Sequence, residues 1–173
     1  MIILITGTSH TGKTLLAQRM LERHGYPYLS MDHLKMGLIR SGHTELTPED
    51  DEKLTAYLWP IVREMIKTAI ENRQNLIVEG CYVPFEWRRD FSEDYLSAIR
   101  FICLAMTDGY IDAHFDEIKI HGFDIESRLD DSGCTADFLK AENRKYAQGF
   151  QTAGEEVAWI EGDYSKAIEP LLN

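Results

Sequence analysis

The chain has 173 residues, of which 44% are hydrophobic, and a formal net charge of −11 at pH 7. That length fits a single domain, and the hydrophobic fraction is ample for one core. The acidic balance argues against a nucleic-acid partner, which takes a basic face. No apolar run approaches the roughly 20 residues of a membrane span, so we expect no membrane partner.

The three cysteines, Cys81, Cys103 and Cys134, are odd in number and lack metal-type spacing. This usage favours reduced thiols and a cytoplasmic protein. The N-terminus leads straight into an apolar run without a basic segment, so we expect no signal peptide. The sequence leaves open whether the protein is a monomer or a homodimer.

Apolar, strand-like runs alternate with helical patterns along the chain, which predicts βαβ units and a parallel sheet with right-handed crossovers. The expected strands lie at about 2–6, 26–29, 75–78, 99–105 and 156–160. The expected helices lie at about 12–24, 31–41, from 47 through 69, from 107 or 108 through 118, 136–150 and after 163.

The helix expected after residue 46 has a distinctive start. Thr47 supplies a hydroxyl cap, Pro48 suits the first helical position, and acidic residues follow. Pro60 lies inside the same apolar pattern, and we expect it to kink or split the helix.

Residues 7–14 match the pattern G-x-x-x-x-G-K-T between an apolar strand and an amphipathic helix. This is the setting of a phosphate-binding loop, in which glycines let successive N–H groups curl around an anion at a helix N-terminus. We therefore predict a nucleoside triphosphate site. Its residues are Gly7, Thr8, Ser9, His10, Thr11, Gly12, Lys13 and Thr14.

Two residues of this loop carry the chemistry. Lys13 would reach the β- and γ-phosphates, and the Thr14 hydroxyl would coordinate Mg²⁺. The expected cofactors are therefore ATP and Mg²⁺, although the loop itself does not distinguish ATP from GTP. His10 fills a variable position, where an exposed side chain is the plainer interpretation.

Ligands of open parallel sheets gather at the carboxyl ends of the strands. The predicted strand ends place polar candidates there, at 7–14, 30–32, 79–82, 107–108 and 161–163. Asp32 follows the second strand, and Glu79 ends the third.

On these residues the chain resembles the P-loop kinases of small molecules, which include nucleoside monophosphate kinases, shikimate kinase and gluconate kinase. The resemblance covers essentially the whole chain. It rests on the loop, on Asp32 in Ser-Met-Asp-His-Leu, on Glu79 in Val-Glu-Gly, and on a polar stretch with Arg128 and Arg144 before the last strand.

The resemblance implies a three-layer α/β fold: a five-stranded parallel sheet of order 2-3-1-4-5 with helices on both faces. It also implies one domain over 1–173, with an acceptor-binding helical segment at about 31–73 and a small lid at about 120–136. The implied function is an ATP-dependent phosphotransferase that moves the γ-phosphate of Mg-ATP to a small metabolite, at a hydroxyl.

Two alternatives remain. A nucleoside monophosphate kinase would use the same scaffold, but its usual arginine soon after Glu79-Gly80 and its paired lid arginines are missing. A regulatory, nucleotide-hydrolysing switch is the other. A GTPase switch would need the motif N-K-x-D, which recognises guanine, and the stretch Asn143-Arg144-Lys145-Tyr146 does not match it.

An acceptor hydroxyl needs a carboxylate within hydrogen-bond reach. Asp32 is the first choice for this base, and a helix N-cap is its alternative role. Glu79 is expected in the Mg²⁺ shell through water, or as a substitute base. Its alternative role is that of a structural partner for N–H groups of the loop.

The remaining candidates are cations and one acid. Arg128, in the lid, and Arg144, on the helix after it, could close on the β–γ bridge. Arg40 and Arg88 could bind an anionic acceptor. The resemblance places the adenine base near Gly162-Asp163-Tyr164.

Overall fold

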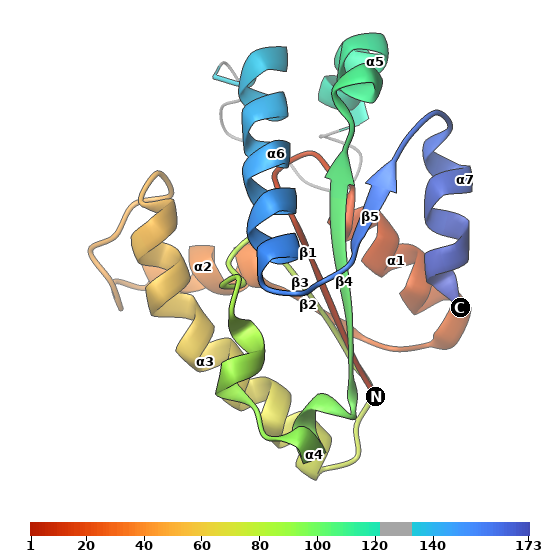
Figure 1. Ribbon diagram of the computed structural model, residues 1–173. Coiled ribbons are helices and arrows are strands. Elements are labelled where there is room, and N and C mark those ends of the chain that lie inside the picture. Colours follow the sequence, from red (N-terminus) through yellow and green to blue (C-terminus); the bar gives the residue numbers. More distant parts are fainter. Residues whose placement is uncertain (122–132) are drawn as a thin grey trace.

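The sheet has five parallel strands in the order β2-β3-β1-β4-β5 in the computed structural model, which describes residues 1–121 and 133–173 (Figure 1). This confirms the expected architecture and strand order. The strands are β1 (Ile2–Gly7), β2 (Tyr28–Ser30), β3 (Leu76–Glu79), β4 (Ile99–Met106) and β5 (Val157–Ile160).

Helices cover both faces of this sheet (Figure 1). One face carries α2 (Met31–Arg40), α3 (Asp51–Glu71), η1 (Trp87–Asp90), α4 (Glu93–Leu96) and the second half of α6 (Ala136–Thr152). The other carries α1 (Lys13–His24), α5 (Asp108–His121), α7 (Tyr164–Ile168) and η2 (Glu169–Leu172).

The central strand β1 is buried along its whole length, which explains its unbroken apolar run. Its side chains alternate between two cores. Ile2 and Leu4 pack with Leu58 of α3, whereas Ile3 and Ile5 pack with α1. Because β1 is held from both faces, the loop that follows it starts from a rigid base.

The start of α3 differs from the expectation. Asp50, not Thr47, is the N-cap, and both the backbone N–H and the hydroxyl of Thr47 donate to the Asp50 carboxylate, at 3.0 and 3.1 Å. Thr47 and Asp50 thus close a turn before the helix. Lys53 also pairs with Asp50, and these contacts lower the pKa of Asp50 to about 2.

Pro60 does not split α3, which continues as one helix over Asp51–Glu71. Pro60 is exposed, so the carbonyl that loses its partner can turn towards water. The neighbouring Leu58 and Val62 are fully buried. This packing outweighs the local cost of the proline.

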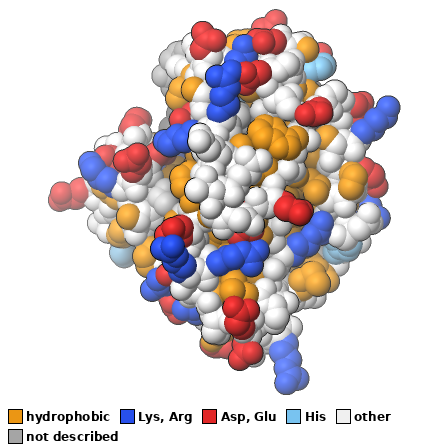
Figure 2. Space-filling view, in the orientation of Figure 1, with side chains coloured by type: hydrophobic (Ala, Val, Ile, Leu, Met, Phe, Trp, Pro, Cys, Tyr) orange, Lys and Arg blue, Asp and Glu red, His pale blue; other side chains and the backbone are white. Residues whose placement is uncertain are grey.

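Acidic and basic side chains are interspersed over the face displayed in Figure 2. Within residues 1–121 and 133–173, no helix is both long enough and apolar enough to cross a membrane.

Candidate active site

Residues 7–12 form a tight turn between β1 and α1, at the carboxyl edge of the sheet. Gly7, His10 and Gly12 all have positive φ, at 146°, 67° and 76°. The Thr11 hydroxyl donates to the Thr8 carbonyl oxygen at 2.9 Å, within the loop. The backbone is therefore shaped as a cradle at a helix N-terminus, as a phosphate site requires.

Neighbouring elements press against both glycines of the loop. A Cβ on Gly7 would lie 2.4 Å from the backbone oxygen of Leu104, and one on Gly12 would lie 2.0 Å from the Tyr164 hydroxyl oxygen. The same hydroxyl donates to the Gly12 carbonyl oxygen at 2.9 Å. The loop is thus held by β4 on one side and α7 on the other.

We predict that Gly7→Ala lowers the free energy of unfolding by about 1–3 kcal/mol, because it combines an unfavourable φ with a clash against fixed backbone. Urea denaturation measures the loss. Gly37→Ala is the control, since nothing lies within 4 Å of its added Cβ. Equal stability of the two variants would contradict the tight approach of β4.

The Lys13 side chain is buried and folds back over the loop, where its ammonium donates to the Thr8 carbonyl oxygen at 2.6 Å. The charge thus sits within the cradle. The Thr8 carbonyl also accepts from Thr11, so it keeps a partner if the ammonium moves towards another acceptor.

Glu79 ends β3 beside β1, with its Cα opposite that of Ile5. Its side chain is 1% exposed, and its Oε2 accepts a hydrogen bond from the Thr14 hydroxyl at 3.4 Å. A hydroxyl and a carboxylate so close together fit Mg²⁺, which prefers oxygen ligands and keeps several waters. Thr14 and Glu79 are therefore the residues that could hold this metal.

Asp32 lies in the first turn of α2, two residues beyond the end of β2. Ser30, not Asp32, occupies the N-cap position, so the capping role for Asp32 is wrong. The Asp32 carboxylate instead pairs with the ammonium of Lys35 at 2.6 Å. It remains partly exposed at the edge of the sheet that carries the loop.

Cys81 follows β3, the strand that lies between β1 and β2 in the sheet. Burial raises the pKa of the Cys81 thiol to about 11, the ammonium of Lys13 opposes this rise, and the carboxylate of Asp32 adds to it. Since β3 pairs with β1 on one side and with β2 on the other, the loop after β1 and Asp32 after β2 both lie at the carboxyl edge of the sheet.

Arg144 lies on α6 at the same edge of the sheet, and Asn143 fixes this stretch. The Asn143 side chain is buried and accepts from the backbone N–H of Met106 at 2.8 Å. Arg144 forms a two-point ion pair with Asp108, the first residue of α5, which lowers the pKa of that carboxyl. Arg144 is thus near the carboxyl end of β4, paired with Asp108.

Two other expected residues, Asp163 and Arg40, lie on other elements. Asp163 is the N-cap of α7, where it accepts from the backbone N–H of Lys166 at 2.9 Å. Arg40 is exposed in the last turn of α2. Arg128 lies outside the described residues.

Arg88 does not join the loop. It makes a two-point ion pair with Glu155, with nitrogen–oxygen distances of 2.5 and 3.0 Å, and stacks 4.8 Å from the ring centre of Trp87. Glu155 precedes β5, at the amino edge of the sheet. The Glu155 side chain is only 5% exposed, so this pair serves to neutralise a buried carboxylate.

We expect Arg88→Met to lower the free energy of unfolding by about 2 kcal/mol, because it leaves Glu155 buried without its cation. Arg89→Met is the matched control. Its partner is Glu86, both side chains are exposed, and removing such a pair costs about 0–1 kcal/mol. Chemical denaturation compares the two, and equal losses would contradict the buried role of the Arg88 pair.

His10, within the loop, contacts the segment before α6. Its Nδ1 lies 3.9 Å from the sulfur of Cys134, a buried residue shortly before α6. Ser9 beside it is exposed, and Thr8 is buried. The chain that enters α6 therefore touches the phosphate loop.

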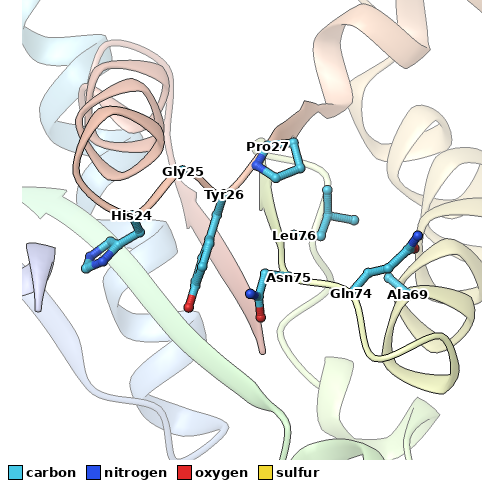
Figure 3. A pocket seen from close by; sticks show the side chains of 8 residues that line it. All are labelled: His24, Gly25, Tyr26, Pro27, Ala69, Gln74, Asn75 and Leu76. Carbon is cyan, nitrogen blue, oxygen red and sulfur yellow. The ribbon is translucent and has the colours of Figure 1, made fainter.

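A separate hollow of about 470 Å³ lies at the amino ends of β2 and β3 (Figure 3). Its lining includes His24 and Tyr26 on one side and Gln74 and Asn75 on the other. It opens at the opposite edge of the sheet from the loop, so it is not part of the candidate site.

The sequence analysis did not include Lys35 in the site, and it did not foresee that Tyr164 contacts the loop. Lys35 could have been found from its i,i+3 spacing to Asp32, which puts both side chains on one face of a helix. The contact of Tyr164 with Gly12 had no such signal, because it joins residues 152 positions apart.

No protein-family model and no curated protein sequence matches the chain. Solved structures do. A gluconokinase from Sinorhizobium meliloti aligns with a TM-score of 0.54 at 15% identity, over 98% of this chain and 88% of that one. A shikimate kinase from Aquifex aeolicus aligns with a TM-score of 0.51 at 15% identity, over 99% and 94%.

A deoxyadenosine kinase from M. mycoides, solved with the products dCMP and dCDP, aligns with a TM-score of 0.56. The identity is again 15%, over 99% of this chain and 97% of that one. Alignments of nearly full length at such low identity concern the fold, which agrees with the strand order and the loop described above. The chain has the fold of the P-loop kinases of small molecules.

Proposed function

We propose that the protein is an ATP-dependent phosphotransferase that moves the γ-phosphate of Mg-ATP to a hydroxyl of a small metabolite. The observation that carries this proposal is the loop at residues 7–14, with Lys13 inside its cradle and Thr14 against Glu79. The solved structures of similar fold support it in class only, since they are kinases of three different small molecules.

The loop would bind the triphosphate through its backbone N–H groups and the start of α1. Lys13 would leave the Thr8 carbonyl and turn to the β- and γ-phosphates. Thr14 and Glu79 would hold Mg²⁺, Glu79 through water. The bound metal would neutralise part of the charge on the transferring group.

Asp32 would accept the proton of the acceptor hydroxyl. Asp32 lies just beyond the end of β2. The acceptor would lie against the segment at about 31–73. If the acceptor carries an anionic group, Arg40 of this segment could bind it. The chemical demand is modest, because phosphoryl transfer depends mainly on positioning and charge neutralisation.

Arg144 is our candidate for the cation that closes on the phosphates, with Arg128 as the second. Arg144 would exchange the Asp108 carboxylate for phosphate oxygens when a lid at about 120–136 closes. Asp108 would hold the guanidinium near the site until then. The nucleotide base would rest near Asp163, beyond β5.

The test is a screen that reads ADP release with Mg-ATP, with and without each member of a panel of sugars, polyols, nucleosides and nucleoside monophosphates. We expect slow hydrolysis without an acceptor and a rise of at least about tenfold with one hydroxyl compound. A rise with monophosphates alone would favour a nucleoside monophosphate kinase. If calorimetry detects no binding of Mg-ATP or Mg-GTP at millimolar concentration, the proposal fails.

A further inference from the structure

A chain of polar contacts begins at Asp32 and runs to the first turn of α3. Lys35 pairs with Asp32 at 2.6 Å and also donates to the Tyr82 hydroxyl oxygen at 2.8 Å. The Tyr82 hydroxyl in turn donates to Oδ1 of Asp51 at 3.3 Å. These four residues, which we call the Lys35 network, join α2, the segment after β3, and α3.

Burial makes this network different from an ordinary pair on a helix. The Lys35 side chain is 11% exposed, and Tyr82 is 2% exposed. The ammonium also lies 5.1 Å from the centre of the Tyr82 ring. An exposed i,i+3 pair is weak, but burial of Lys35 and Tyr82 strengthens their contact and restricts the rotamers of these two side chains.

We propose that Lys35 is a positioning residue, which fixes the Asp32 carboxylate in one orientation and ties it to the start of α3 through Tyr82 and Asp51. The inference rests on the proposed function, since it assigns Lys35 its role through the proposed base. Lys35 does not touch the phosphates in this role. Its effect on the reaction passes through Asp32.

The network also connects the base to the segment at about 31–73. Asp51 begins α3, and Asp32 lies in the first turn of α2, so Lys35 bridges the two helices of that segment. A shift of α3 relative to β3 would strain the contact between Tyr82 and Asp51. Lys35 would pass that shift to the carboxylate.

The first test uses Mg-ATP with water as the acceptor and measures single-turnover hydrolysis. We expect Lys35→Met to lower the rate about tenfold, because a misplaced base loses its alignment, and to change the KM for ATP less than twofold. Lys35→Arg, which keeps the charge, should recover part of the rate. Lys145→Met, which removes an exposed i,i+3 pair with Glu142, is the control without effect.

Additivity decides whether Lys35 acts through Asp32. We expect Lys35→Met to cause no further loss in an Asp32→Asn background, because residues that act as a unit are not additive. Losses that multiply to within about twofold would overturn the inference, since independent sites behave that way. A loss confined to the KM for ATP would also overturn it.

A second measurement needs no turnover. The carboxyl-carbon NMR signal of Asp32 at pH 7 should move in Lys35→Met relative to the unchanged protein, because the carboxylate loses the ammonium that lies 2.6 Å away. An unmoved signal would contradict the inference. If ATP is not hydrolysed but the signal moves, the proposed function fails, whereas the contact of Lys35 with Asp32 stands.

Discussion

Lys13→Met should nearly abolish phosphoryl transfer from Mg-ATP and leave the fold intact. The ammonium is the charge within the cradle, 2.6 Å from the Thr8 carbonyl, and in the proposed reaction it stabilises charge on the transferring group. Removing one such preorganised donor costs about 10²–10³-fold in rate. We therefore expect turnover of about a hundredth to a thousandth of the original rate.

The fold should survive because the loop has other supports. The Thr8 carbonyl keeps the Thr11 hydroxyl as a donor, and Tyr164 still binds the Gly12 carbonyl. Circular dichroism and urea denaturation test this point, with Lys145→Met as a control for loss of a lysine elsewhere. Normal turnover in a folded Lys13→Met protein would remove the loop from the active site.

Asp32→Asn should slow the chemical step by about 10²–10⁴-fold, the usual contribution of a positioned proton acceptor. Asparagine is close in shape but cannot take up the proton. The affinity for Mg-ATP should change less than about threefold, because the proposed base contacts the acceptor, not the nucleotide.

Single-turnover kinetics with the acceptor found in the screen separates the two quantities, and equilibrium binding measures the nucleotide. Asp94→Asn is the control, an exposed carboxylate on α4 at the other edge of the sheet. A variant with an unchanged chemical step would exclude Asp32 as the base, and Glu79 would become the candidate.

The two predictions differ in how directly the sequence supports them. The residues around Lys13 are contiguous, so the motif alone specifies a strand, a glycine turn and a helix. The position of Asp32 relative to the loop depends on the sheet, because it is set by the pairing of β2 with β3 and of β3 with β1.

Local rules also failed in identifiable places. Thr47 looked like a helix cap, but its bonds to Asp50 make a turn, and the helix begins after Asp50. Pro60 looked like a break, but burial of the neighbouring apolar residues keeps α3 continuous. In both cases contacts with other residues outweighed a propensity of a single residue.

By itself the sequence determined the alternation of strands and helices, the glycine-containing turn between β1 and α1, and the carboxylates that follow β2 and end β3, because each depends on contiguous residues or on a regular period. Only the tertiary structure decided the partners of the charged side chains. Arg88 pairs with Glu155 across 67 positions, and Arg144 with Asp108 across 36. The spacing of residues along the chain does not predict such ion pairs, because they form where the crossover connections bring distant segments together.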